Sequence, residues 1–466
     1  MTGPPLNIPR TCLFTVVAAL VLRMGVAGFL YPEHLNPDRG YWRFAGEAGK
    51  IAQSLLEGRG FGSPFFADTG PTALMPPVYP YLIAGVFEFF GTYTKASALV
   101  MLSLDSLFSA LTCLPIYFIA RKCFCDRVAV IAAWTWAFFP YAIYFSADFI
   151  WPTVLTTLLL SLLFLMVLHL ASSPRRSLWL GFSLLSGLAT LTEPIVLSVL
   201  PLLGGWACYR LYWKNQRWFP SAAVAALALA AFISPWFIRN YRTFHKPILF
   251  RDNFGLELYV GNNGVSWHWA SPGIHPSASK TEWQEFLSLG ELGYMARKQH
   301  QAAEFINSHR GWFIWMSLRR AVYFWTNFWS LDRRYLAEEP FDPFNIFFST
   351  ALTVLALAGL WRAFRSRLTV AVPYAIVLFF FPVTYYITHM QDYYRRPIDP
   401  FFVILAAYGL APRGRLPEQP GESARTTRSA GSLLDPIGRR GQRERSRRGY
   451  LPAKRRQSRP RRTSPI

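Results

Sequence analysis

Two classes of residue are scarce in this chain: cysteine overall, and charged side chains within long stretches. Among 466 residues there are five cysteines, and the closest pair, Cys123 and Cys125, has no histidine or second pair nearby. Neither a zinc site nor a disulfide framework is therefore predicted. Charged residues make up 16% of the chain, against 52% hydrophobic and 17% aromatic residues. This composition excludes a single soluble core and indicates an integral membrane protein.

Acidic residues are also scarce, because 26 Asp and Glu face 48 Lys and Arg and leave a formal net charge of +22. Most of this excess lies in the tail Pro412–Ile466, which holds sixteen Arg or Lys against four Asp or Glu. The tail nearly lacks large apolar residues, so we expect it to be disordered and cytoplasmic, held near anionic lipid headgroups. Its basic residues are not interleaved with aromatic ones, so no nucleic acid partner is expected.

Long apolar runs dominate the rest of the chain. A helix of about 18 to 25 apolar residues crosses the hydrocarbon core of a bilayer. The expected fold class is therefore an all-α, multi-pass membrane protein with about ten transmembrane helices. The candidate spans are Thr11–Leu30, Ala96–Ala120, Val128–Phe145, Ile150–Leu170, Leu178–Leu191, Ile195–Tyr212, Ala222–Ile238, Phe344–Leu360, Leu368–Ile387 and Phe401–Leu410.

The charges between these runs predict the orientation. Four short loops are basic: residues 121–127, 172–176, 210–217 and 362–367. The positive-inside rule places these loops and both termini in the cytoplasm. We therefore expect a protein of the cytoplasmic (inner) membrane, with a transmembrane domain over residues 1–411 and the tail over 412–466. The first outer loop (residues 31–95) and the long outer loop (residues 239–343) then face the exterior or periplasm, together with the active site.

The first outer loop contains a predicted amphipathic helix over Trp42–Glu57. Apolar residues recur there at three- and four-residue intervals, so the helix would lie flat on the bilayer. Glu47 falls at the edge of the apolar stripe, beside Ile51, where partial loss of water would raise the pKa of its carboxyl group and suit a general base. The spacing equally allows a surface salt bridge between Glu47 and Arg43 or Lys50.

Two other outer segments have predicted structures. Thr69–Pro80 is too rich in proline to be helical before Val78, and it reads as shaped backbone that lines a cavity. Gly311–Trp329 is an aromatic, apolar run, but a span there would place the basic loops downstream on the wrong side of the membrane. It is therefore predicted to be an interfacial helix, with its Trp and Tyr residues at headgroup level.

Single acidic residues stand at the outer ends of two spans. Asp148 lies within SADFIWP and Glu193 within LTEP. Ionisable residues at such positions are candidates for function, here substrate binding, although each is equally compatible with a helix cap or a solvated end. Asp38 lies between the first span and the amphipathic helix, and it reads as a solvated loop acid.

Two basic clusters face the same outer side. One holds Arg239, Arg242, Lys246 and Arg251, and the other holds His389, Arg395 and Arg396. Outward-facing segments are usually poor in Lys and Arg, so these cations need a separate explanation. Recognition of phosphate by guanidinium groups would supply one. The alternative is ion pairing with Asp252, Asp392 or Asp399.

Taken together, these stretches resemble membrane-embedded glycosyltransferases of the C-type fold, in particular the protein O-mannosyltransferase and lipid A aminoarabinose transferase group. The resemblance covers about Thr11–Leu410 and leaves out the basic tail. It rests on the order and membrane placement of several motifs: GEAGKIAQSLLEGRGFGSPF, PPVYPYLIAGVFEFFG, the basic inner turn that ends the next span, TEP, GLELYVGNNG and DYYRRPIDP.

The resemblance implies an inverting transfer of a sugar from a polyprenyl-phosphate carrier to an acceptor hydroxyl on a lipid, glycan or protein at the outer face. It gives Glu47 the role of the base that activates the acceptor. Asp38 is the alternative, because this chain lacks the Asp-Glu pair that family members often carry near the end of the first span.

The resemblance also implies which residues contact the carrier phosphate. They are Tyr394, Arg395 and Arg396, with Arg239 and Arg242 as weaker candidates. The first outer loop holds no DxD motif, so neither an obligatory metal nor another cofactor is predicted.

Two other classes of function are compatible with the composition. A transporter would carry charged or broken helices in mid-span, usually in two corresponding halves, whereas these spans are nearly free of charge and show no repeat. A lipid-linked glycan polymerase or ligase would have similar outer loops but would use a lipid-diphosphate donor.

Overall fold

The computed structural model describes residues 9–34, 44–265, 272–338 and 340–412. All of them belong to one compact unit, Met1–Gly414. Asp38, Arg43 and nearly all of the basic tail lie outside the described residues. Within the described ranges, regular structure is helical, and extended pairing is limited to the isolated bridges Phe44–Ile150 and Gly62–Pro71. The all-α expectation is thus confirmed for this part of the chain.

The helices of the first half follow one another with short connections. They are α1 (Arg10–His34), α2 (Gly46–Leu56), α3 (Val78–Phe90), α4 (Lys95–Leu111), α5 (Cys113–Cys123), α6 (Asp126–Ala137), α7 (Pro140–Ala147), α8 (Thr153–Leu170), α9 (Arg176–Thr192), the 3₁₀ helix η2 (Pro194–Ser198), α10 (Leu200–Trp213) and α11 (Phe219–Phe244).

The second half begins with the longest connection between spans and ends with a buried helix. Its elements are α12 (Phe254–Gly261), η3 (Pro272–Ile274), α13 (Lys280–Ser308), α14 (Arg310–Thr326), α15 (Arg333–Glu338), α16 (Asp342–Arg365), α17 (Ala371–Phe380), α18 (Val383–Ile387), η4 (Asp392–Ile398) and α19 (Asp399–Leu410).

Every predicted span falls on a helix or on consecutive helices. In the part of the chain that the structure describes, five segments are long and apolar enough to cross a membrane: Arg10–Phe29, Lys95–Cys123, Thr153–Leu170, Phe219–Phe244 and Asp342–Arg365. The pair α6 and α7, bent by 43°, gives a sixth if it is one span. The other predicted spans coincide with shorter helices, so the protein is a multi-pass membrane protein and the number ten stays a prediction.

The bend between α6 and α7 has a cause in the sequence. Pro140 stands in the first turn of α7, and a proline there cannot donate a backbone hydrogen bond to the preceding turn. Phe139, just before it, is extended at φ −68° and ψ 117°, as the residue before a proline prefers. The predicted single span over residues 128–145 is therefore broken at this point.

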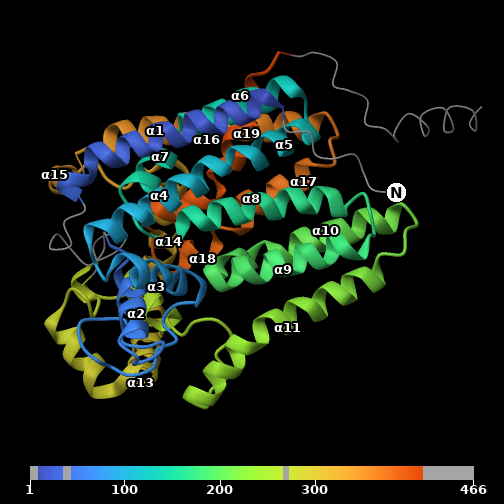
Figure 1. Cartoon of the computed structure of the whole chain (residues 1–466). Coiled ribbons are helices and arrows are strands. Elements are labelled where there is room, and N and C mark those ends of the chain that lie inside the picture. Colours follow the sequence, from blue (N-terminus) through green and yellow to red (C-terminus); the bar gives the residue numbers. More distant parts are fainter. Residues whose placement is uncertain (1–8, 35–43, 266–271, 339, 413–466) are drawn as a thin grey trace, which may run out of the picture. The chain divides into compact units, whose positions relative to one another are not determined.

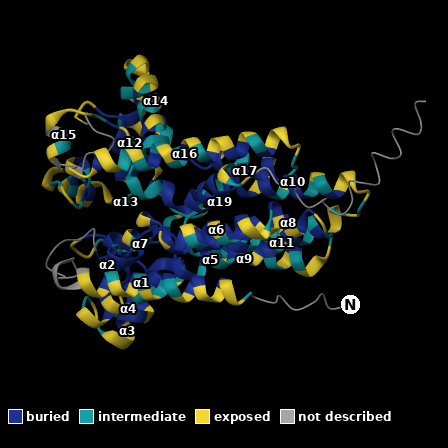
Figure 2. Cartoon of the chain, turned by 90° about the horizontal axis from the view of Figure 1, so that it is seen from above, coloured by how far each residue is buried: buried dark blue, intermediate teal, exposed yellow. Residues whose placement is uncertain are grey.

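The core lies along α8 and α19. Nearly every residue of α19 is buried, and Figure 2 shows this helix dark blue among its neighbours. It packs so tightly on α16 that a methyl group on Gly359 would lie 2.0 Å from the carbonyl oxygen of Leu405. In contrast, α11 buries few residues, as expected of a span that faces lipid.

The segments between the spans gather at one end of the helices. Figure 1 shows α2, α3 and α13 together beyond the ends of the long helices. The helix α2 begins at Gly46, four residues after the predicted start, because Ala45 adopts a left-handed conformation with φ 67°. The backbone of 69–77 is not helical and α3 starts at Val78, as predicted.

Candidate functional site

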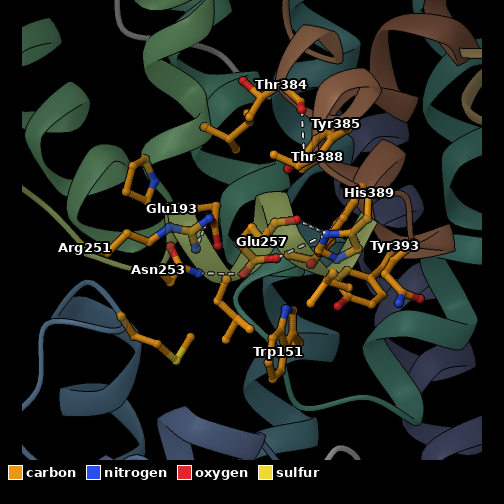
Figure 3. Close-up of a pocket in the computed structure, with 18 of the residues that line it drawn as sticks. Trp151, Glu193, Arg251, Asn253, Glu257, Thr384, Tyr385, Thr388, His389 and Tyr393 are labelled. Carbon is orange, nitrogen blue, oxygen red and sulfur yellow. Dashed lines mark hydrogen bonds and ion pairs between the residues drawn. The ribbon is translucent and has the colours of Figure 1, made fainter. Parts of the chain in front are cut away.

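A cavity of about 670 Å³ lies where four distant segments meet. Its lining includes residues from α2, from η2 and the residue before it, from α12 with the segment preceding it, and from the stretch between α18 and α19 (Figure 3). The charged or polar residues that matter most are Glu47, Glu193, Arg251, Glu257, His389 and Tyr394. We call this space the large cavity.

Glu47 reaches the large cavity from the first turn of α2. Only 6% of the residue is exposed, and the N-terminal position in the helix favours a negative charge. The backbone before it is fixed, since Phe44 bridges to Ile150 and stacks on Phe87 with a centroid separation of 5.7 Å. The structure thus places the predicted base in a buried, positioned setting.

His275 is the nearest basic group to Glu47 in the described structure. Its Nε2 lies 3.7 Å from Oε1 of Glu47. Burial lowers the pKa of His275 to about 3, so the imidazole is neutral near pH 7. Of the two predicted salt-bridge partners, Lys50 contacts Gln53 and the ring of Tyr93 instead. The other partner, Arg43, lies outside the described residues.

An ion pair joins Glu193 to Arg251 in the wall of the cavity. The two charged groups approach to 3.1 Å. Burial by itself would lower the pKa of Arg251, but the carboxylates of Glu193 and Glu257 outweigh it and raise this pKa. Burial raises the pKa of Glu193, while Arg251 opposes that shift. The pair keeps a full guanidinium charge at the cavity.

Glu257 connects two parts of the site from its position on α12. Its Oε1 accepts a hydrogen bond of 2.6 Å from the amide of Asn253. Its Oε2 lies 3.3 Å from Nδ1 of His389, and Nε2 of the same imidazole lies 2.8 Å from the hydroxyl of Tyr394. Figure 3 shows Glu257 between the Arg251–Glu193 pair and His389.

Three aromatic residues also line the cavity. Tyr393 lies with its ring centroid 5.8 Å from that of Phe149 and 6.0 Å from that of Trp151. Phe149 and Trp151 are themselves 6.1 Å apart. The site therefore combines an aromatic wall with carboxylates, the guanidinium of Arg251 and the phenols of four tyrosines, Tyr335, Tyr385, Tyr393 and Tyr394.

Arg395 and Arg396 are not in the lining of the large cavity. They are 2% and 4% exposed, and both donate to Asp399 at 2.9 Å. Arg395 also lies over the ring of Phe402 at 4.1 Å, and Arg396 lies over that of Tyr141 at 3.5 Å. The ion pairing considered as the alternative for these cations is present, and a direct phosphate contact by either stays a prediction.

Arg239 and Arg242 also lie outside the lining of the large cavity. Arg239 donates to the carbonyl oxygens of Thr72 at 2.7 Å and Phe61 at 2.6 Å. It thereby holds the irregular loop that leads to Leu74 and Met75 in the cavity wall. Arg242 is exposed in the last turn of α11. Phosphate contacts by these two residues stay predictions as well.

The remaining predicted residues lie outside the lining of the cavity or outside the described residues. Asp148 is 1% exposed and ends α7, next to the lining residue Phe149 but not itself in the lining. Asp38, the alternative base, lies outside the described residues. In the described ranges, no group of three or more His, Cys, Asp or Glu side chains has an arrangement that could hold a metal ion.

Sequence reasoning gave Glu257 no role in the site and gave Arg251 and His389 none beyond membership of the basic clusters, whose guanidinium groups could recognise phosphate. Arg251 and His389 had been noticed as members of basic clusters, and Glu257 lies in the stretch GLELYVGNNG. The sequence did contain a signal for the site, because both basic clusters lie next to polar residues in segments that are predicted to face outward. Their pairing depends on how α12 packs against residues 388–389, and no local pattern contains that information.

Comparison with known proteins supports the fold. Residues 75–238 match the family described as dolichyl-phosphate-mannose-protein mannosyltransferase. Among solved structures, the oligosaccharyltransferase AglB from Archaeoglobus fulgidus, in complex with an inhibitory peptide and a dolichol-phosphate, matches with a TM-score of 0.51 and 16% identity over 85% of this chain and 50% of that one. The same oligosaccharyltransferase tethered with an acceptor peptide matches with a TM-score of 0.51 and 16% identity over 85% of this chain and 49% of that one.

ArnT from Cupriavidus metallidurans bound to undecaprenyl phosphate is also similar, with a TM-score of 0.37 and 15% identity over 85% of this chain and 77% of that one. No curated protein gives a significant match. The chain spans about half the length of AglB. These findings confirm the predicted resemblance and the C-type glycosyltransferase fold.

Proposed function

We propose that the protein transfers a sugar from a polyprenyl-phosphate carrier to an acceptor hydroxyl group, with inversion at the anomeric carbon. The observation that carries this proposal is the presence of Glu47 and Arg251 in one large cavity, because the reaction needs a base and a fixed cation. The match to a dolichyl-phosphate-mannose-dependent family supports the class of donor. The fold shared with a protein solved with dolichol-phosphate supports it further.

In this mechanism the acceptor oxygen attacks the anomeric carbon from the face opposite the phosphate. Glu47 takes the hydroxyl proton as the new C–O bond forms. The bond from the anomeric carbon to the phosphate oxygen breaks, and its electron pair stays on the phosphate, which leaves as a monoester. Attack from the opposite face inverts the configuration.

Arg251 stabilises the negative charge that grows on the leaving phosphate. A guanidinium group presents several N–H donors in a rigid fork that fits phosphate oxygens. Fixed donors of this kind act without reorganisation while the charge develops. Glu193, predicted to bind substrate, acts here as the partner that orients Arg251 from 3.1 Å.

The proposed location is the outer face of the cytoplasmic membrane. The four basic loops support this orientation through the positive-inside rule. The acceptor is then a lipid, glycan or protein that reaches the membrane surface from outside. The basic tail would remain on the cytoplasmic side, near anionic lipids.

The direct test is incubation of membranes containing the protein with radiolabelled polyprenyl-phosphate sugars. We expect label to move to a lipid, glycan or protein fraction, with the opposite anomeric configuration in the product. Label that moves only from a polyprenyl-diphosphate donor would instead indicate a glycan polymerase or ligase. Solute flux into vesicles without any transfer of label would indicate a transporter.

A further inference from the structure

The hydrogen bonds around His389 fix which of its nitrogens carries the proton. Its Nδ1 faces two oxygens of Glu257, the carboxylate Oε2 at 3.3 Å and the backbone carbonyl at 3.3 Å. Both are acceptors, so Nδ1 must be protonated. Burial lowers the pKa of His389, which leaves the ring neutral near pH 7 and its Nε2 without a proton.

This arrangement fixes the direction of the next hydrogen bond. Since Nε2 of His389 can only accept, the hydroxyl of Tyr394 donates to it across 2.8 Å. The ring of Tyr394 is held by stacking on Tyr385 at 4.3 Å, which fixes the position of its hydroxyl oxygen. Tyr394 therefore offers the cavity lone pairs and no proton. Such a group attracts hydroxyl donors and disfavours a phosphate anion, which has only acceptor oxygens.

The aromatic wall stands next to this hydroxyl. Tyr393 follows Tyr394 in the lining, and their ring centroids are 4.8 Å apart. The hydroxyl of Tyr393 is in hydrogen-bonding contact with that of Tyr394. With Phe149 and Trp151, Tyr393 forms an apolar surface of the kind on which the C–H faces of sugar rings pack.

The aromatic wall lines the same cavity as the two groups of the proposed mechanism, Glu47 and Arg251. Tyr393 lies close enough to Glu47, and Tyr394 close enough to Arg251, for the charges to act on the phenols. In an inverting transfer, the sugar ring must lie between the base and the phosphate. A ring held there would therefore be within reach of the wall.

We propose that Phe149, Trp151, Tyr393 and Tyr394 form the subsite for the donor sugar, with Glu257 and His389 as positioning residues that hold Tyr394 as a hydrogen-bond acceptor for a sugar hydroxyl. This inference rests on the proposed function and deepens it. It assigns Tyr394 to the sugar, whereas the family resemblance assigned it to the phosphate.

The test measures binding to the full-length protein in nanodiscs. The probes are bare polyprenyl phosphate and its mannose, glucose and galactose esters, followed by the monodeoxy analogues of the ester that binds most tightly. We expect that ester to bind the wild-type protein more tightly than the bare carrier, and one deoxy analogue to bind about 3- to 10-fold more weakly than its parent, as for one lost hydrogen bond.

Tyr394→Phe should weaken binding of the parent ester by the same factor. It should leave binding of the sensitive deoxy analogue and of the bare carrier unchanged. Trp151→Ala should weaken binding of all sugar esters but not of the bare carrier. Trp151→Phe, which keeps an aromatic ring, should retain most of the wild-type affinity for the esters. These results would support the subsite.

Three results would overturn it. Equal weakening of the bare carrier and its sugar esters by Tyr394→Phe would put Tyr394 on the phosphate. Equal binding of all esters and the bare carrier to the wild-type protein would contradict the sugar subsite but not the proposed function. If the bare carrier itself did not bind the wild-type protein, the proposed function would fail, and the subsite with it.

Discussion

Arg251 and Glu193 form an ion pair at 3.1 Å in the wall of the large cavity, although they come from opposite ends of the segment that contains α10 and α11. Neither residue completes the site alone, since Glu193 supplies the counter-charge that holds the guanidinium in place. A half-buried pair of this kind costs desolvation free energy and is weak evidence for a purely stabilising role. Its position in a cavity points to use by a ligand.

Replacement of Arg251 should reduce affinity for polyprenyl phosphate by about 10- to 100-fold, the effect of losing a charge-assisted contact. The single change would leave Glu193 buried without its partner, so the informative variant is the double substitution Arg251→Gln with Glu193→Gln. Binding to purified protein measures the effect. Arg297→Ala is the control, because this exposed arginine pairs with Glu285 on α13, outside the cavity. Unchanged affinity in the double variant would contradict the assignment.

Glu47→Gln should reduce sugar transfer by about 10²- to 10⁴-fold, the usual contribution of a general base. The amide has nearly the same shape as the carboxylate, so binding of polyprenyl phosphate should be retained. Transfer of label and carrier binding are measured on the same preparation. Glu57→Gln, at the exposed end of the same helix, should behave as wild type. Normal turnover in Glu47→Gln would direct the search for the base to Asp38.

Arg395→Ala distinguishes a structural role from a phosphate contact. Its guanidinium donates to Asp399 and to the backbone of Trp325, so its loss should destabilise the protein by about 3 kcal/mol. Thermal unfolding of the solubilised protein gives the change. Arg395→Met should recover part of it, because the longer side chain refills the space against Phe402 while Asp399 keeps its ion pair with Arg396. Full stability together with lost carrier binding would favour the phosphate contact predicted from the resemblance.

Gly261→Ala should disturb the contact between Glu257 and His389. A methyl group at Gly261 would lie 1.9 Å from the carbonyl oxygen of Thr388, so α12 and the segment before His389 would have to move apart. Overpacking of this kind costs about 1–3 kcal/mol. Unfolding and sugar transfer should both suffer. The matched control is Gly264→Ala, since nothing lies within 4 Å of the added methyl group there. Equal behaviour of the two variants would show that the close approach is not needed.

Stability should fall between about pH 4.5 and pH 7 because of Glu291. Burial raises the pKa of this carboxyl from 4.5 to about 7, opposed by hydrogen bonds from Thr72 and Ala73. The nearby charges are Asp252, which raises the pKa further, and Arg239, which lowers it. The folded protein thus holds a proton that the unfolded chain releases above pH 4.5, and this stabilisation is lost as the pH rises through 7.

The expected loss is about 3 kcal/mol, taken from the difference between the two pKa values, 4.5 and about 7, at 1.36 kcal/mol per unit. Glu291→Gln should flatten the pH dependence of the free energy of unfolding. Glu304→Gln, on the exposed face of the same helix α13, should leave the dependence unchanged. An equally steep profile in Glu291→Gln would assign the effect to another group, such as Asp252, whose pKa burial raises to about 6.

The sequence by itself determined the helices and their class. Apolar runs of membrane length predict helices, because a helix satisfies its own backbone groups in lipid. The stretch before Val78 is non-helical because proline lacks the backbone donor, and the aromatic run over α14 likewise follows from local composition. The amphipathic pattern around Glu47 also placed that residue on an edge that the structure buries. These features depend on neighbours a few residues apart, which a linear pattern contains.

The tertiary structure alone decided which charges meet. The sequence left Arg395 and Arg396 in DYYRRPIDP open between a phosphate contact and ion pairing, and in the structure both donate to Asp399, one turn further along. Arg251, Glu257 and His389 look unremarkable in sequence, yet packing brings them into one cavity. The energy of a charged group depends on its burial and on its distance to charges in segments far apart in the chain. Neither quantity can be read from the sequence around the charged residue.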